Sequence, residues 1–441
     1  MISAEHSASS HSLPRIVIVG GGAGGLELAS ALGHKLGKKG KAEIVLIDKS
    51  RSHIWKPLLH EVATGSLDAD LDGVIYSVHA MQHGYRFELG EMIGLDCQAQ
   101  HISLAAKWDQ EGKLLSTERQ LGYDQLVLAV GSVSNDFNTK GVKEHCYFLD
   151  SHTQAQRFHH ALLDNFTRVH QNPNVDCLDI AIVGGGATGV ELSAELYHVA
   201  QLIKSYGLAQ MTPAKLKIQL IEAGPRILPA LPERISASAR KELSLLGVEV
   251  MENVRINEAT SEGFMTSDGQ LIAAQMMVWA AGVKAPDFIR NIEGLALTRN
   301  NQVLVEPTLH AKGQANLFVI GDCCACGQAD GSFVPPRAQS AHQMASCVFK
   351  NIMNRRNGKP EIEYHYVDHG SLVNLSRFST VGSLMGNLNK NSMFVEGKIA
   401  RLVYLSLYRM HQYAIHGARR MMALWLAEKL MRAVRPKMKL H

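Results

Sequence analysis

Two glycine-rich segments, each directly following a short apolar run, constrain this chain more than any other feature. Residues 20–25 (GGGAGG) follow the run 16–19, and residues 184–189 (GGGATG) follow the run 180–183. Each segment precedes a sequence typical of a helix. The pyrophosphate of a dinucleotide binds backbone N–H groups at a helix N-terminus, and glycines leave room for that approach. The sequence therefore predicts two dinucleotide sites, with binding residues Gly20, Gly22, Gly24, Gly25, Gly184, Gly186, Thr188 and Gly189.

An acidic residue ends the next apolar strand after each segment. Asp48 lies 23 residues beyond Gly25, near the spacing expected of an acid that binds a ribose. Glu222 lies 33 residues beyond Gly189, and we attribute the longer spacing to an extended helix and loop. A carboxylate at this position repels a 2′-phosphate, which favours NADH over NADPH. Arg226 nearby argues in the opposite direction.

Three further apolar segments read as buried strands that return to these sites. Residues 123–131 end at Gly131, residues 276–282 end at Gly282, and residues 316–322 end at Asp322, where an acid suits a flavin ribityl chain. The sequence therefore predicts an α/β fold with a flavin domain interrupted by a nicotinamide domain. The expected boundaries are a polar N-terminal arm at 1–13, the FAD-binding domain at 14–177 and 296–395, the NADH-binding domain at 178–295, and a C-terminal membrane-anchoring region at 396–441.

Composition limits the cellular location and the partners expected for a protein with this fold. The chain has 441 residues and a net charge of +4, but residues 401–441 contain a basic excess, with Glu428 as the single acid. The beginning of the sequence lacks a signal peptide pattern, and no segment approaches the roughly 20 apolar residues that cross a bilayer. An odd number of cysteines, seven, argues against a disulfide framework. No nucleic acid is expected as a partner.

The two glycine segments, the Gly321–Asp322 turn, residues 55–65 (WKPLLHEVATG) and residues 338–343 (AQSAHQ) together resemble the bacterial type II NADH dehydrogenases. The resemblance covers almost the whole chain and extends to the ending 435–441. It implies a glutathione-reductase-like flavoprotein with two Rossmann-like domains and C-terminal amphipathic membrane-binding helices. Such an enzyme oxidises NADH by hydride transfer to FAD and passes the electrons to a membrane quinone, ubiquinone or menaquinone, without pumping protons.

The resemblance also implies a location and a set of catalytic residues. The enzyme is expected to be peripheral on the cytoplasmic face of the bacterial inner membrane, against anionic lipid. The sequence does not decide whether it forms a homodimer. Glu191, placed in the first turn of the helix after the second motif, is implicated in the electron or proton step. Gln339 and Gln343 lie four residues apart on one helix face and match a quinone-site pattern. Lys56, Pro57 and Leu58 are expected to line the flavin, and residues 368–371 to flank the quinone.

Each of these assignments has a purely structural alternative. A carboxylate such as Glu191 is favoured near any helix N-terminus. The 338–343 segment also suits a helix packed through its alanines with solvated glutamines, and residues 55–59 also suit a core. The apolar runs 402–408 and 421–427, with Trp425, suit helices lying in a membrane interface, or a helix pair that packs on the body or on a second subunit.

Other functions remain to be weighed against the main prediction. Cys323, Cys324 and Cys326 lack a matching ligand pair nearby, so no metal is predicted. No cysteine precedes residue 97, so disulfide chemistry at the flavin is not expected. The alternative enzymes are a sulfide:quinone oxidoreductase and a soluble NADH-dependent flavin reductase. The alternative without catalysis is a redox-sensing flavoprotein that binds NADH.

Overall fold

The computed structural model describes residues 13–109, 111–172, 174–375, 379–385, 392–431 and 438–439. The predicted N-terminal arm, apart from Leu13, and most of the ending 435–441 lie outside these residues. The chain forms two compact units. The first unit comprises Met1–His53, Val74–Ser132 and Lys284–Tyr366, and the second comprises Ile54–Gly73, Val133–Val283 and Val367–His441.

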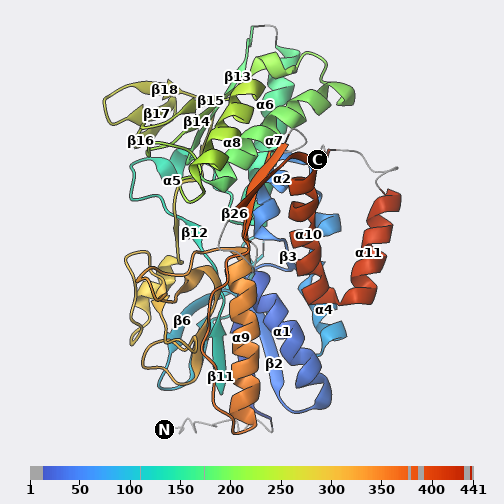
Figure 1. Cartoon of the computed structure of the whole chain (residues 1–441), viewed down its shortest axis with the longest axis vertical. Coiled ribbons are helices and arrows are strands. Elements are labelled where there is room, and N and C mark those ends of the chain that lie inside the picture. Colours follow the sequence, from blue (N-terminus) through green and yellow to red (C-terminus); the bar gives the residue numbers. More distant parts are fainter. Residues whose placement is uncertain are drawn as a thin grey trace. The chain divides into compact units, whose positions relative to one another are not determined.

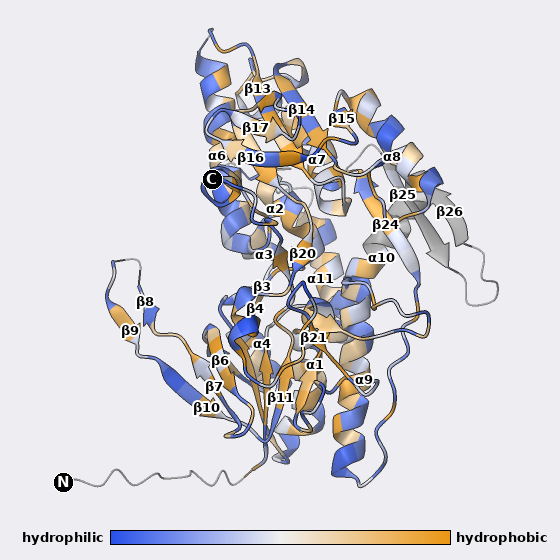
Figure 2. Cartoon of the chain, turned by 90° about the vertical axis from the view of Figure 1, so that its left-hand side faces the viewer, coloured by the Kyte–Doolittle hydropathy of each residue, from blue (hydrophilic) through white to orange (hydrophobic). Residues whose placement is uncertain are grey.

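A parallel sheet with the strand order β22-β11-β1-β2-β5 forms the centre of the first unit (Figure 1). Its strands are β1 (Arg15–Val19), β2 (Glu43–Asp48), β5 (Arg86–Leu89), β11 (Gln125–Leu128) and β22 (Leu317–Val319). In the central strand β1, Val17 lies between Val45 and Leu126 of its two neighbours. These apolar runs are buried, as expected for a parallel sheet whose two faces are both covered. The strand β11 is correspondingly hydrophobic in Figure 2.

Two helices that lie far apart in the sequence run side by side in the first unit. They are α1 (Ala23–Lys35) and α9 (Ala338–Arg356) (Figure 1). A Cβ atom at Gly24 would lie 2.9 Å from the carbonyl oxygen of Ala341, so glycine permits this close packing. The remaining elements of the unit are η1 (Gly37–Lys39), β3 (Ser52–His53), β4 (Val74–Ile75), α4 (Tyr76–His83), β6 (Met92–Asp96), β7 (His101–Leu104), β8 (Lys107–Trp108), β9 (Leu114–Ser116), β10 (Arg119–Gly122), η5 (Asp287–Asn291), β21 (Val303–Leu304), η6 (Gly321–Cys323) and β23 (Cys324–Ala325).

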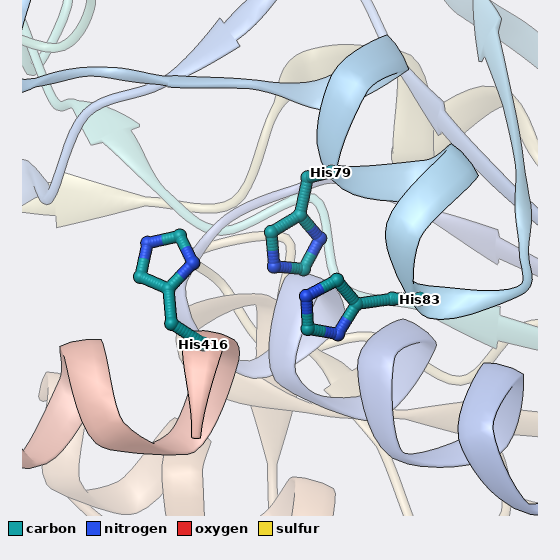
Figure 3. Close-up of side chains that lie close together, drawn as sticks. All are labelled: His79, His83 and His416. Atoms are coloured by element: carbon teal, nitrogen blue, oxygen red, sulfur yellow. The ribbon is translucent and has the colours of Figure 1, made fainter. Parts of the chain in front are cut away.

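Buried histidines hold α4 against α1. His79 and His83 lie one turn apart on α4, and their rings stack with centroids 3.8 Å apart (Figure 3). The Nδ1 atom of His83 lies 2.8 Å from the hydroxyl of Ser30 on α1, and Nδ1 of His79 lies 2.9 Å from the hydroxyl of Tyr85. Hydrogen bonds of this kind satisfy polar groups that would otherwise be buried without partners.

The second unit repeats the parallel architecture with the strand order β15-β14-β13-β19. Its strands are β13 (Leu178–Val183), β14 (Leu216–Ile221), β15 (Glu249–Met251) and β19 (Met276–Trp279). The helix α7 (Ala187–Ile203) is buried over most of its surface, which fits its predominantly apolar sequence. It is followed by η3 (Lys204–Tyr206) and η4 (Pro213–Lys215), and these turns occupy the long spacing before Glu222. The α/β fold with two Rossmann-like sheets is therefore confirmed.

The core of the second unit includes segments that the sequence assigned to the flavin domain. Phe158 and Phe166 of α6 (His152–Gln171) are buried in one hydrophobic cluster with Ile180 and Val190. The short helix α2 (Leu59–Thr64) contributes Leu59 and Val62 to the same cluster. The described residues of 54–73, 133–177 and 367–395 therefore fall in the second unit, because apolar side chains from each of these segments complete its core.

Several smaller elements complete the second unit. These are η2 (Lys56–Leu58), α3 (Ala69–Asp72), β12 (Val133–Ser134), α5 (Val142–His145), α8 (Glu233–Leu246), β16 (Ile256–Thr260), β17 (Gly263–Thr266), β18 (Leu271–Ala273) and β20 (Val283–Lys284), which ends in the first unit. An antiparallel sheet of β24 (Gly370–Leu375), β25 (Ser379–Met385) and β26 (Ser392–Glu396) follows.

The two C-terminal helices differ in how they pack. In α10 (Gly397–His416), His411 and Ile415 are buried, and the His411 ring stacks on Trp55 with centroids 5.8 Å apart. In α11 (Ala418–Met431), no residue is buried. Within the described part of the chain, no helix is both long and apolar enough to cross a membrane.

Candidate active site

The corner between β1 and α1 leaves a helix N-terminus uncovered. Gly20 has a φ of +103°, and a Cβ atom there would lie 2.3 Å from the carbonyl oxygen of Ala129. A Cβ at Gly25 would lie 1.9 Å from the carbonyl oxygen of Gly20. At Gly22, in contrast, nothing lies within 4 Å of an added Cβ. The corner is therefore tightly packed at Gly20 and Gly25 and open at Gly22. A pyrophosphate can reach the N–H groups of α1 through this opening.

Asp48 connects this corner to the end of β2. One carboxylate oxygen accepts a hydrogen bond from the N–H of Gly21 at 2.7 Å, and the other accepts one from the N–H of Ser50 at 2.7 Å. Burial raises the pKa of the Asp48 carboxyl, although these two N–H groups oppose the shift. The side chain thus stands at a fixed position beside the glycine corner, which suits an acid that binds the ribose diol of a dinucleotide.

Tyr76 is a residue of this corner that sequence reasoning missed. Its hydroxyl donates a hydrogen bond to the carbonyl oxygen of Gly21 at 2.7 Å, and its ring stacks on Phe87 at 5.0 Å. An added Cβ at Gly21 would lie 2.3 Å from the Tyr76 hydroxyl oxygen. Tyr76 therefore packs against the glycine loop at Gly21 and holds it by this hydrogen bond. No motif spacing marks it, because it comes from α4, which follows the β1-α1-β2 segment in the sequence.

The glycine corner and Asp48 together form one candidate dinucleotide site, which we call the first cradle. The other residues predicted for this cradle lie near the ends of β11 and β22. Gly131 follows β11, and the hydroxyl of the next residue, Ser132, donates to the Asp322 carboxylate at 2.7 Å. The amide of Gln302 donates to the Asp322 carbonyl oxygen at 3.0 Å. Parallel strands end at a common edge of their sheet. The first unit therefore brings Gly20, Gly22, Gly24, Gly25, Asp48, Gly131 and Asp322 to one edge of the sheet.

The AQSAHQ segment begins α9 and packs on α1 through its alanine and histidine. The Nδ1 atom of His342 lies 2.5 Å from the Glu27 carboxylate, and this hydrogen bond raises the pKa of His342. Ala341 is buried beside Gly24, as the structural interpretation of the segment expected. Gln339 and Gln343 are half-buried on the same helix. The contact between Glu27 and His342 was not predicted, since these residues lie 315 positions apart.

The corner between β13 and α7 repeats the first geometry. Gly184 has a φ of +114°, and an added Cβ would lie 2.7 Å from Ala280. A Cβ at Gly189 would lie 2.1 Å from the carbonyl oxygen of Gly184, whereas Gly186 again has nothing within 4 Å. Thr188 is exposed in the first turn of α7. The predicted Gly282 follows β19, and an added Cβ there would lie 2.4 Å from the ring of Phe137.

Glu222 occupies the place in this cradle that Asp48 occupies in the first. Its carboxylate accepts hydrogen bonds from the N–H of Gly185 at 2.8 Å and from the N–H of Gly224 at 2.7 Å. Arg226, which argued for NADPH, donates to the carbonyl oxygens of Leu231 and Pro229 at 2.8 and 3.1 Å. The guanidinium is thus engaged by its own loop, which weakens the one argument against NADH.

Glu191 belongs to a buried cluster between α7 and α2. The helix begins at Ala187 and has no acid in its first turn, so Glu191 stands in the second turn, not in the first as the sequence suggested. The helix dipole acts mainly on the first turn and explains this residue poorly. One carboxylate oxygen of Glu191 accepts the N–H of Asn374 at 3.0 Å, and the other lies 3.6 Å from Nδ1 of His60.

The ionisation of this cluster departs from ordinary values. Burial raises the pKa of Glu191 to about 8. Burial also lowers the pKa of His60 to about 4. Glu195, one turn after Glu191, accepts a hydrogen bond from the hydroxyl of Ser66. Perturbed acid–base groups of this kind are frequent at catalytic sites.

The remaining predicted residues lie beside this cluster or in the first unit. Lys56, Pro57 and Leu58 form η2 directly before α2, and the carbonyl of Pro57 accepts a hydrogen bond from His60. Residues 368–371 lie in the second unit, whereas Gln339 and Gln343 lie in the first. The thiols of Cys323 and Cys324 are buried in the first unit, and burial raises the pKa of Cys323 to about 12.

Two parallel sheets, each with a glycine corner, a bridging acid and an uncovered helix N-terminus, define a protein that holds two dinucleotides. Comparison with known proteins agrees. The profile of the pyridine nucleotide-disulphide oxidoreductase family matches residues 14–345. A type II NADH:quinone oxidoreductase from Haemophilus influenzae is 46% identical over 97% of this chain and 100% of its own length. One from Staphylococcus aureus is 30% identical over 84% of this chain and 90% of its own length.

A solved structure shares the fold at low sequence identity. NDH2 from Plasmodium falciparum in complex with NADH superimposes with a TM-score of 0.78 at 18% identity, over 97% of this chain and 100% of that one. The chain belongs to the type II NADH:quinone oxidoreductases, within the pyridine nucleotide-disulphide oxidoreductase family. The resemblance stated from the sequence motifs is confirmed.

Proposed function

We propose that this enzyme oxidises NADH and passes the electrons, by way of FAD, to a quinone. The observation that carries the proposal is the presence of two complete dinucleotide cradles in a chain that is 46% identical over 97% of its length to a type II NADH:quinone oxidoreductase. When bound, FAD supplies a ring that accepts hydride from a nicotinamide and releases electrons to an acceptor.

The residues of the first cradle fit FAD. Gly22 leaves an open approach to the N-terminus of α1, and Asp48 is held by two backbone N–H groups beside it. Tyr76 stabilises the loop between them. Asp322, fixed by Ser132 and Gln302, presents polar groups at the same sheet edge for the flavin's ribityl chain. Lys56, Pro57 and Leu58 are proposed to line the flavin.

The second cradle suits NADH better than NADPH. Both oxygens of Glu222 accept a backbone N–H, so the carboxylate is fixed where a ribose diol can donate to it. A 2′-phosphate adds close to two negative charges, which a carboxylate at hydrogen-bond distance repels. Because Arg226 donates to its own loop carbonyls, it is already engaged away from that phosphate.

The proposed catalytic residues act on the quinone and on protons. Gln339 and Gln343 have amide groups that donate hydrogen bonds to carbonyl oxygens of a quinone. Glu191, whose pKa of about 8 keeps it protonated near neutral pH, is a suitable proton donor. These roles rest on residue chemistry and on the family resemblance.

Anaerobic titration tests the proposed reaction. NADH should bleach the visible flavin absorbance of the purified protein, and a short-chain quinone should restore it. Sulfide should leave the absorbance unchanged, which separates the enzyme from a sulfide:quinone oxidoreductase. Bleaching by NADH without recovery on adding quinone would instead favour a redox-sensing flavoprotein. A protein that NADH fails to bleach would refute the proposal.

We also propose that α11 attaches the enzyme to the cytoplasmic face of the membrane, where NADH is produced. Its exposed apolar residues are Met422, Leu424, Trp425, Leu426, Leu430 and Met431. The ammonium of Lys429 lies 4.1 Å from the centroid of the Trp425 ring, and Arg419 and Arg420 add positive charge. Exposed apolar residues beside bases are typical of helices that lie on anionic lipid.

Substitutions within α11 test the attachment more cleanly than truncation. Removal of residues from Ala418 onward also removes Met438, which is buried in the core of the second unit. We expect Leu424→Glu with Leu426→Glu to abolish co-sedimentation with vesicles that contain phosphatidylglycerol, while NADH still bleaches the flavin. Leu245→Glu, at an exposed leucine of α8, is the matched control. Unchanged sedimentation of the double variant would contradict attachment through α11, and a change in oligomeric state in solution would assign the helix to a subunit contact instead.

A further inference from the structure

A buried imidazole stands among three carboxyl groups in the second unit. The Nδ1 atom of His60 lies 3.6 Å from Glu191, and its Nε2 atom lies 3.9 Å from Glu61. Glu195 also acts electrostatically on His60. His60 is 3% exposed and Glu191 is 7% exposed, whereas Glu61 is only partly buried. The cluster thus forms a chain of ionisable groups from the partly exposed Glu61 through His60 to Glu191.

The cluster contains one dissociable proton for Glu191 and His60 together near neutral pH. Burial raises the pKa of Glu191, and the charges of Glu61 and Glu195 act in the same direction, against the N–H of Asn374. Burial lowers the pKa of His60, against Glu195 and the Pro57 carbonyl. The carboxyl is therefore protonated while the imidazole is neutral. A proton lost from Glu191 leaves a carboxylate that strengthens the affinity of His60 for a replacement.

We propose that Glu191 and His60 share a proton, and that His60 is the positioning residue that reloads Glu191 from the side of Glu61. The inference deepens the proposed reaction at the same site and rests on it. The separation of 3.6 Å between His60 and Glu191 exceeds a hydrogen bond, and such contacts often shorten when substrates bind.

The proton balance of the reaction requires a proton supply, which the path from Glu61 through His60 to Glu191 would provide. We call this path the relay. NADH releases two electrons and one proton as hydride, whereas a quinone that becomes a quinol gains two electrons and two protons. One further proton must therefore come from water in each turnover. In the proposed step the O–H bond of Glu191 breaks and an O–H bond forms on the quinol. His60 then takes a proton on Nε2 by way of Glu61, and the resulting imidazolium gives its Nδ1 proton to the Glu191 carboxylate and becomes neutral again.

Infrared titration of the purified oxidised holoenzyme tests whether the proton is shared. The carbonyl band of a protonated carboxyl group should disappear with a midpoint near pH 8, as the pKa of Glu191 requires. Glu191→Gln should remove this band. His60→Asn should move its midpoint by more than about half a pH unit, because coupled groups titrate together. An unmoved midpoint would mean that His60 only fills the core, and the proposal would be wrong.

Kinetics with two acceptors tests the relay itself. Ferricyanide accepts electrons without protons, whereas a short-chain quinone needs protons. We expect His60→Asn to slow quinone reduction roughly tenfold, and Glu191→Gln roughly a hundredfold, with a much smaller loss of ferricyanide reduction in each variant. The loss in His60→Asn should grow as the pH rises from 6 to 9. Equal losses with both acceptors would overturn the relay.

Two controls keep the result interpretable. His159→Asn removes another buried histidine of the second unit, whose pKa burial also lowers to about 4, and it should leave the quinone rate unchanged. His60→Gln provides a second substitution, and the flavin absorbance of each variant reports whether it has folded. If the unmodified enzyme reduced ferricyanide but no quinone, the proposed function would fail. If it reduced quinone and His60→Asn matched it at every pH, only the relay would fail.

Discussion

The two glycine corners of this enzyme carry a glutamate at the same position, two residues after the last glycine, and use it differently. Glu27 on α1 contacts His342, a partly exposed histidine whose pKa the carboxylate raises. Glu191 on α7 faces His60, a buried histidine whose pKa is lowered. Each pair consists of a glutamate and a histidine. Burial therefore decides whether the imidazole is charged, since desolvation penalises the charged form more than one carboxylate at 3.6 Å favours it.

The acids that bond the glycine loops, Asp48 in the first corner and Glu222 in the second, show a second difference. In the first corner, Tyr76 donates a hydrogen bond to Gly21, whose N–H in turn donates to Asp48, and burial raises the pKa of Asp48. At the corresponding loop of the second corner, a Cβ atom on Gly185 would meet Glu222 and Ile227, each at 2.9 Å. The first cradle is thus reinforced by an aromatic residue from a distant helix.

The largest expected effect distinguishes the two cradles by the dinucleotide that each one binds. Gly22→Val and Gly186→Val each place a side chain in open space, so both variants should fold. Gly22→Val should yield a nearly colourless protein, because the side chain blocks the pyrophosphate of FAD. Gly186→Val should keep its colour and raise KM for NADH roughly a hundredfold, the loss expected for a few charge-assisted hydrogen bonds. The reverse pattern, measured by flavin absorbance and steady-state kinetics, would exchange the assignments of the two sites.

The next effect concerns coenzyme choice in the second cradle. Glu222→Gln retains a side-chain oxygen near the glycine loop but removes the negative charge. We expect the ratio of kcat/KM for NADPH to that for NADH to rise roughly tenfold, since about 1.4 kcal/mol of repulsion corresponds to that factor. The corresponding Asp48→Asn should not change this ratio. An unchanged ratio in Glu222→Gln would show that another group excludes the 2′-phosphate.

A smaller effect contrasts the two glutamates through the pH dependence of stability. The folded-state pKa of Glu191 is about 8, above its ordinary 4.5, so its stabilising contribution is present below pH 4.5 and is lost as the pH rises toward and through 8. Glu191→Gln removes this loss. We expect its melting temperature, relative to the unmodified enzyme, to increase by several degrees between pH 5 and pH 9. A constant difference across that range would show that Glu191 titrates normally.

The smallest effect belongs to the partly exposed pair. The Glu27 hydrogen bond raises the folded-state pKa of His342, so its contribution is fully present below pH 6.5 and is lost as the pH rises through the raised value. Glu27→Gln should lower the His342 pKa toward 6.5, as read by NMR of the imidazole. The melting temperature should fall by only about a degree or two, since solvent screens a partly exposed pair. A His342 pKa that stays elevated in Glu27→Gln would assign the shift to another group.

Much of the site could be predicted from the sequence because its parts are local. The glycine corners and the acids at the ends of β2 and β14 follow from strand, turn and helix within single βαβ units. The basic composition of the tail likewise belongs to the sequence alone. The placement of Glu191 in the first turn was wrong by one residue, because α7 begins at Ala187.

The tertiary structure decided everything that joins distant segments. Tyr76 below Gly21, His342 beside Glu27 and His60 beside Glu191 carry no spacing signal, since their partners are 55, 315 and 131 residues away. The extent of the second unit was also decided there, because Phe158 and Phe166 pack into a core that no local pattern reveals. Local backbone geometry is encoded within a few residues, whereas burial, and with it the ionisation of Glu191 and His60, exists only once the chain has folded.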